Sequence, residues 1–155
     1  MKRASAILPA GTWDFSARAG SIALDFDRRH RRRLVLEDGE LLLDLPHAVR
    51  LREGDGLLCD DGTIVAVIAD PEAVMDIHAH DRASLVRIAW HLGNRHLAVQ
   101  LVRDRLRIRA DHVIAGMVQG LGGHVEVLQA PFDPEPGAYA EAPHSHDHDD
   151  HDHQH

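Results

Sequence analysis

The sequence has one cysteine, few aromatic residues and no long apolar run. With Cys59 alone, the chain can form neither an internal disulfide nor a metal site built only of thiolates. Three Phe, two Trp and one Tyr are too few to give the predicted strands an aromatic platform for RNA bases. The apolar stretch after Met1 is too short for a secretory core, and no run approaches the roughly 20 apolar residues that span a membrane. We therefore expect a cytoplasmic protein whose metal sites use imidazole and carboxylate.

The chain also lacks the rigid motifs that are typical of enzymes. It contains no His-Glu-x-x-His, no nucleophile elbow and no phosphate-binding loop, so a metallohydrolase is disfavoured and we expect no catalytic residues. The net charge of −8 does not favour an anionic polymer as a partner. The basic run Arg28–Arg33 is short and without interleaved aromatics. We interpret this run as the solvated edge of a sheet, with an acidic protein partner as the alternative.

Residues 1–70 are predicted to form a small all-β domain. Apolar and polar residues alternate over 21–27, which suits a strand with one buried face. Asp38-Gly39 and Asp61-Gly62 supply the positive φ of tight turns between apolar segments, and so predict two hairpins. The hairpins would join 34–36 to 41–43 and 57–59 to 63–68.

Residues 71–133 are predicted to form a ferredoxin-like βαββαβ domain after a boundary at Asp70-Pro71. Asp81 is a suitable N-cap for a helix that begins at Arg82 and stops at Gly93. Asp111 caps a second helix, which the glycines at 120, 122 and 123 end. The predicted strands are 73–78, 97–102, 106–109 and 124–128. This order gives an antiparallel sheet backed by two helices.

Residues 134–155 are predicted to be a disordered His-rich tail that binds metal. From Pro131 onward the composition turns to Pro, Gly, Glu and Ala, which cannot bury enough surface to fold alone. Within 144–155 the chain has six histidines and four aspartates. Imidazole suits nickel, zinc and copper, and it binds only after it has lost its proton. The candidate ligands are His144, His146, His148, His151, His153 and His155.

The remaining histidines give weaker signals. His96 follows the expected end of the first helix, and His112 follows the cap of the second, and either could be an ordinary surface residue. We interpret His78 and His80 as strand and loop residues. His124 has no evident partner.

The segment Trp90-His91-Leu92-Gly93-Asn94-Arg95-His96 resembles a signature of the UreE family, the urease accessory nickel metallochaperones. The similarity runs nearly from end to end, and its Gly-Asn-Arg-His part is specific. The supporting stretches are collinear and individually weak: Leu45-Pro46, Leu51–Asp55, Asp111–Val113, Ala130–Glu135, Gly137–Tyr139 and the His-rich tail.

The resemblance implies a homodimer through the C-terminal domains, in which His96 of each chain contributes to one nickel site on the two-fold axis. His112 is a candidate auxiliary ligand, although Ala110 stands where the family often has the first histidine of His-x-His. The first domain would be peptide-binding-like and dock urease apoprotein or its maturation factors. The family also implies a nickel-dependent meeting with the urease accessory GTPase.

Without the resemblance, the residues do not select the metal. Imidazole sites would also take Zn(II) or Cu(II), and copper would outcompete nickel at equilibrium. A His-rich cytoplasmic protein that buffers or stores nickel, zinc or copper is therefore the alternative function.

Overall fold

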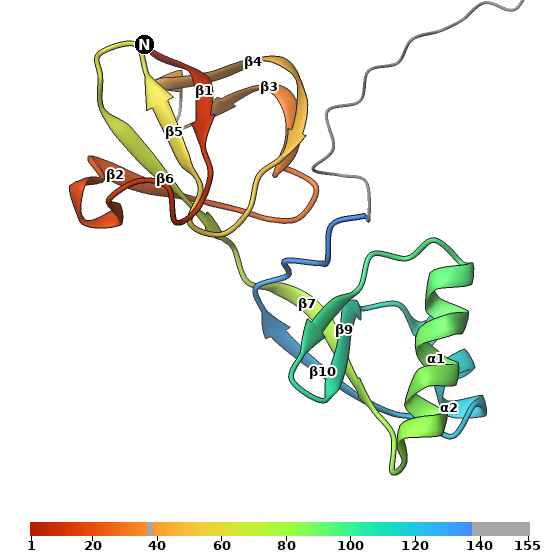
Figure 1. Cartoon of the computed structure of the whole chain (residues 1–155). Helices are drawn as coiled ribbons and strands as arrows, with labels where there is room; N and C mark the ends of the chain where they lie inside the picture. Colours follow the sequence, from red (N-terminus) through yellow and green to blue (C-terminus); the bar gives the residue numbers. More distant parts are fainter. Residues whose placement is uncertain (37–38, 138–155) are drawn as a thin grey trace, which may run out of the picture.

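The computed structural model describes residues 1–36 and 39–137, which form two sheets that follow one another along the chain (Figure 1). The first sheet has six strands in the order β2-β6-β5-β1-β4-β3, and the second has four in the order β10-β7-β9-β8. The first part contains β1 (Lys2–Leu8), a short 3-10 helix η1 (Phe15–Ala17), β2 (Gly20–Leu24), β3 (His30–Leu36), β4 (Leu41–Arg50), β5 (Gly56–Cys59) and β6 (Ile64–Ala69). The second contains β7 (Glu72–His78), α1 (Arg82–Asn94), β8 (Gln100–Val102), β9 (Arg105–Arg109), α2 (His112–Gly120) and β10 (His124–Ala130).

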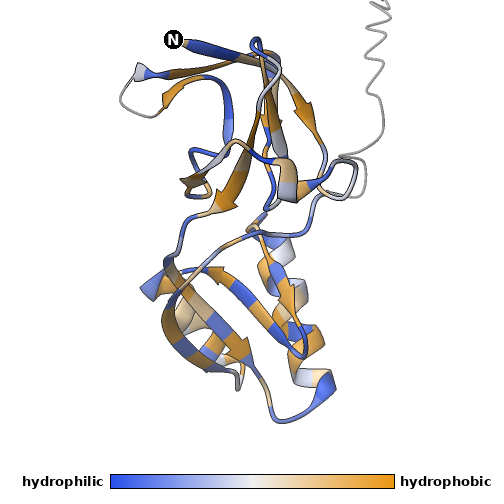
Figure 2. Ribbon diagram, turned by 90° about the vertical axis from the view of Figure 1, so that its left-hand side faces the viewer, coloured by the Kyte–Doolittle hydropathy of each residue, from blue (hydrophilic) through white to orange (hydrophobic). Residues whose placement is uncertain are grey.

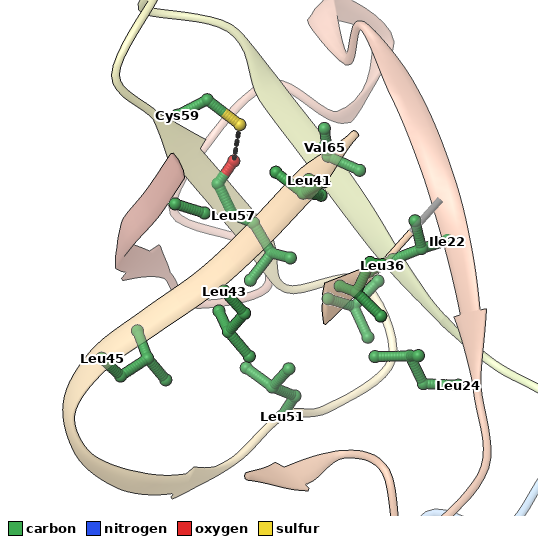
Figure 3. Packing of buried hydrophobic residues seen from close by; sticks show 12 residues of the cluster. Ile22, Leu24, Leu36, Leu41, Leu43, Leu45, Leu51, Leu57, Cys59 and Val65 are labelled. Carbon is green, nitrogen blue, oxygen red and sulfur yellow. Dashed lines mark hydrogen bonds between the residues drawn. The ribbon is translucent and has the colours of Figure 1, made fainter. Parts of the chain in front are cut away.

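The core of the first sheet follows the two-residue period of its strands (Figure 3). In β4, Leu41, Leu43 and Leu45 are at most 3% exposed, whereas Leu42 and Asp44 between them are half-buried. These leucines pack against apolar side chains of the neighbouring strands and of the loop after β4, among them Ile22, Leu24, Leu36, Leu51, Leu57, Cys59 and Val65.

Both predicted hairpins are confirmed. Leu36 pairs with Leu41 across the first turn, where Gly39 has a φ of 97°. Leu57 pairs with Val65 across the second, where Gly62 has a φ of 84°. Glycine fits both turns because its missing Cβ removes the penalty of the left-handed region.

The strand β1 is not among the predicted elements, although it lies inside the sheet between β4 and β5. It pairs in parallel with β4 and antiparallel with β5. Ala4 is its one wholly buried residue among exposed and half-buried neighbours. A strand that buries so little apolar surface has no clear hydrophobic alternation, and its pairing partners are distant in the sequence.

The second part has the predicted order of strands and helices, with both helices on one face of an antiparallel sheet (Figure 1). Met75 and Ile77 of β7 point to that face and form a core with Ile88 and Leu92 of α1. The strands alternate apolar and polar residues accordingly (Figure 2). Among the described residues, no helix has the length and apolarity needed to cross a membrane.

The two parts meet around Phe26 and Phe132, whose rings lie 5.2 Å apart between centroids. Both side chains pack with Val74 of β7 in a small cluster that holds residues from either side of the junction. Asp27 also forms an ion pair with Arg109 of β9 across this junction, with 3.1 Å between nitrogen and oxygen.

Arg29 corrects the interpretation of the basic run as a solvated edge. Its side chain is wholly buried, whereas the neighbouring arginines at 31, 32 and 33 are exposed. Its guanidinium donates to the carbonyl oxygens of Leu24 and Phe132, and to the carboxylate of Asp133 at 3.4 Å. Arg29 therefore ties the first part of the chain to the segment that follows β10.

The segment from Pro131 onward, whose composition suggested that it cannot fold alone, is packed against the rest of the chain over its next few residues. Phe132 is wholly buried, Pro134 is buried, and the Glu135 N–H donates to the Val99 carbonyl at 2.9 Å. The composition of this segment concealed its packing, because one phenylalanine supplies most of the buried apolar surface. The predicted tail histidines lie outside the described residues.

Cys59 is expected to react slowly with alkylating agents in the folded protein. It is 4% exposed, and burial raises the pKa of its thiol, so less thiolate forms at a given pH. Mass spectrometry after iodoacetamide treatment at pH 8 should show alkylation slower than in urea by more than about tenfold, because access requires local opening. Equal rates in the two states would contradict this burial.

Candidate metal centre

The helix α1 determines where His96 lies. The Asp81 carboxylate caps it by accepting a hydrogen bond from the Ser84 N–H at 2.7 Å. This bond lowers the pKa of the Asp81 carboxyl, so the carboxylate is charged at neutral pH. Its negative charge interacts favourably with the positive end of the helix dipole. Ile88 and Leu92 are wholly buried and fix the face of the helix that meets the sheet.

The helix ends one residue later than predicted, and His96 occupies the key position of its C-terminal cap. Arg95 is the C-cap, and His96 follows with a φ of 57°, in the left-handed region. The His96 N–H donates to the Gly93 carbonyl at 3.0 Å, and the Leu97 N–H donates to the Leu92 carbonyl at 3.2 Å. These two bonds define a Schellman motif, whose left-handed residue is usually glycine.

A histidine at this position places an exposed imidazole at the end of a rigid element. The left-handed conformation costs an ordinary L-residue about 1 kcal/mol or more, although histidine tolerates it better than most. Leu97 anchors the turn by packing against the core that contains Leu92. His96 itself is exposed. The backbone conformation could not be predicted from the sequence, which suggested Gly93 as the terminating residue.

An apolar strip runs along the exposed face of α1 toward His96. Val86 and Trp90, one helical turn apart, are 62% and 63% exposed. Val113 at the start of α2 is 61% exposed. Neighbouring large apolar side chains that are exposed, as Val86 and Trp90 are, are typical of a surface that another protein covers.

His112 is the first residue of α2 and is exposed. The preceding Asp111 caps the helix and accepts hydrogen bonds from the Val113 N–H at 2.9 Å and the Ile114 N–H at 3.2 Å. Leu97 and Asp111 line one cleft of about 380 Å³, so the segments carrying His96 and His112 border the same hollow.

Within residues 1–36 and 39–137, no group of three or more His, Cys, Asp or Glu side chains is arranged to hold a metal ion. His96 and His112 therefore do not form a complete site with other described residues of one chain. The predicted tail ligands His144, His146, His148, His151, His153 and His155 lie outside that part of the chain. An exposed imidazole on a rigid cap can still supply one ligand to a site that further ligands complete.

One further pair of histidines was not predicted from the sequence. His78 and His124 lie opposite one another on β7 and β10, and their rings are stacked with centroids 5.0 Å apart. The register of two strands that are 46 residues apart along the chain carries no local signal, so the sequence offered no means of pairing them.

Comparison with known proteins first defines the class. The family model for the N-terminal domain of the UreE urease accessory protein matches residues 4–70, and the model for its C-terminal domain matches residues 72–155. The two matches follow one another along the chain in the same way as the two sheets do. The protein is thus of the urease accessory class.

Individual relatives agree with this result. The urease accessory protein UreE of Bradyrhizobium sp. (strain ORS 278) is 52% identical over 147 residues, which cover 93% of this chain and 70% of the relative. The UreE protein of Beijerinckia indica subsp. indica is 46% identical over 143 residues, which cover 90% of this chain and 82% of the relative. The chain belongs to the UreE family, whose members are accessory proteins of urease and not enzymes themselves.

Proposed function

We propose that the protein is a nickel metallochaperone that delivers Ni(II) to apo-urease during assembly of its metallocentre. The observation that carries the proposal is the exposed imidazole of His96, held in a left-handed cap at the end of α1. Membership of the UreE family favours delivery to urease over storage without a recipient. Nickel is the cargo, and Zn(II) or Cu(II) would bind the same imidazoles in vitro.

The nickel site belongs to a homodimer formed through the C-terminal domain. In a two-fold dimer, a residue near the axis meets its own copy, so one His96 per chain becomes a pair of ligands. The exposed side chains of Val86 and Trp90 supply apolar surface that such an interface would cover. Two imidazoles leave coordination positions open, which suits a site that must release its ion.

The rest of the chain has supporting roles. His112 is an auxiliary ligand, and the His-rich tail over residues 134–155 captures nickel and loads the central site. Residues 1–70 dock urease apoprotein, and the urease accessory GTPase joins in the presence of nickel, all in the cytoplasm. Residues 71–133 form the metal-binding and dimerisation domain. Its observed strand order, β10-β7-β9-β8, supports a ferredoxin-like fold for it.

Activation of apo-urease by the nickel-loaded protein tests the proposal. In the presence of a competing chelator, the wild-type chain should activate urease, and His96→Ala should not. A tail variant, in which the histidines at 144, 146, 148, 151, 153 and 155 are replaced by alanine, should activate urease with less nickel carried per chain. Equilibrium dialysis gives the nickel content of each protein.

The control is His80→Ala, which removes an exposed histidine of the second domain that is not among the proposed ligands. It should leave activation unchanged. Activation by His96→Ala at the wild-type level would exclude the shared site. A His96→Ala chain that remains dimeric in light scattering but fails to activate would separate the ligand role of His96 from dimer formation.

A further inference from the structure

The second pair of histidines lies on the face of the C-terminal sheet that the helices leave uncovered. Residues opposite one another on antiparallel strands point to the same face, and successive residues of a strand alternate between faces. Ile77 of β7 points into the core beneath the helices. Its neighbour His78, and His124 opposite on β10, therefore project from the other face.

The two rings are close and one of them is incompletely bonded. Their centroids lie 5.0 Å apart with 27° between the ring planes. The Nδ1 atom of His78 is buried, and no described residue forms a hydrogen bond with it. A buried imidazole nitrogen without a partner is unfavourable, and a bound ion or water would remove the penalty. His124 is exposed and His78 is half-buried, so the pair is partly open to solvent.

The charges around the pair are balanced. His78 borders an open cleft of about 540 Å³, which is also lined by Asp81, Asp104 and the arginines at 82, 103 and 105. The arginine at 105 forms an ion pair of 2.7 Å with Glu126, which lies two residues from His124 on the same face. This ion pair offsets one of the positive charges around the pair, and a cation can approach.

We infer that His78 and His124 form a second metal site, in which two imidazoles on adjacent strands chelate one divalent transition ion. Water completes the coordination shell, because no third His, Cys, Asp or Glu of the described residues joins them. Imidazole nitrogen is a suitable ligand for Ni(II), Cu(II) and Zn(II). Both ligands lie on strands of one sheet, so the backbone needs little ordering when the ion binds. The side chains rotate out of their stacked arrangement until one nitrogen of each ring faces the ion.

This site is separate from the one proposed at His96. His78 precedes α1 and His96 follows it, and a 13-residue helix is about 20 Å long. One ion cannot bridge that distance. The two sites therefore make independent contributions to nickel binding, and each can be removed without the other.

Histidine modification by diethyl pyrocarbonate, mapped residue by residue by mass spectrometry in the full-length chain, tests the inference. The probe is Ni(II) alone, which should slow modification of His124 in the wild type. In the His78→Asn variant this protection of His124 should be lost, while protection of His96 persists. His47→Asn, which removes an exposed histidine of the first domain, is the matched control and should leave His124 protected.

Two results would overturn the site. One is protection of His124 that survives in His78→Asn. The other is no protection of His124 in the wild type at nickel concentrations that protect His96. An unchanged urea midpoint for His78→Asn would show that lost protection does not reflect unfolding. Because His96 is measured in the same spectra, failure of this site is distinguishable from failure of the proposed nickel chaperone.

Discussion

Replacing His96 by glycine is expected to abolish nickel binding at the dimer axis and at the same time to stabilise the fold. The imidazole is the ligand, so its loss removes the proposed site. The backbone at this position has a φ of 57°, which glycine adopts without the steric cost that a Cβ brings. After allowance for the greater freedom of glycine in the unfolded chain, the gain should be about 1 kcal/mol. Urea unfolding and calorimetric titration with nickel measure the two effects.

The controls separate conformation from chemistry. His96→Ala removes the imidazole and keeps the Cβ, so it should lose nickel without the gain in stability. Arg103→Gly offers the converse, because Arg103 also has a φ of 57° and lies in the turn between β8 and β9. It should stabilise the protein by a similar amount and leave nickel binding at His96 unchanged. A His96→Gly protein less stable than His96→Ala would contradict the cap geometry.

If both results hold, His96 serves as a ligand at a position where glycine would make the fold more stable. A Schellman motif favours glycine at its left-handed position, and the chain has a ligand there instead. The cost is small, and the benefit is a ligand whose backbone position is fixed by two backbone hydrogen bonds and the buried side chain of Leu92. A donor site needs such a fixed ligand at its centre, whereas capture of the ion can rely on flexible ones.

Features with local signals were predicted well from the sequence. The turns at Gly39 and Gly62 and the caps at Asp81 and Asp111 each depend on a few adjacent residues, and the structure has all four. The Gly-Asn-Arg-His segment is likewise local, and it was enough to indicate the family. The turns and caps are determined by backbone preferences and capping bonds that act within one turn.

Features that depend on distant partners were missed. The strand β1 has its partners in β4 and β5, and His78 meets His124 through strand register. The composition around Phe132 gave no sign of packing, yet its ring is buried against Phe26, more than 100 residues earlier in the chain. In each case the free energy comes from tertiary contacts, which leave no periodic pattern in the sequence.

Arg29→Ala is expected to destabilise the protein by about 3 kcal/mol, because it removes a buried charge whose partners stay behind. The carbonyl oxygen of Phe132 would lose its donor in a buried site, and such an unsatisfied group costs about 1–3 kcal/mol. The carbonyl oxygen of Leu24 would keep its hydrogen bond from the Asp70 N–H at 2.9 Å. Asp133 would keep its ion pair with Arg52 at 3.2 Å, which limits the loss. Urea unfolding followed by circular dichroism gives the change in the free energy of unfolding.

The same substitution should also loosen the junction between the two domains. Arg29 connects β2 and the loop after it to the segment that follows β10. Without Arg29, the junction between the domains depends more strongly on the contact between Phe26 and Phe132. Calorimetry should then resolve two melting transitions where the wild type has one. Arg31→Ala, two residues away and exposed, should change the stability by no more than about 0.5 kcal/mol. Equal effects of the two substitutions would show that burial of Arg29 contributes nothing to the junction.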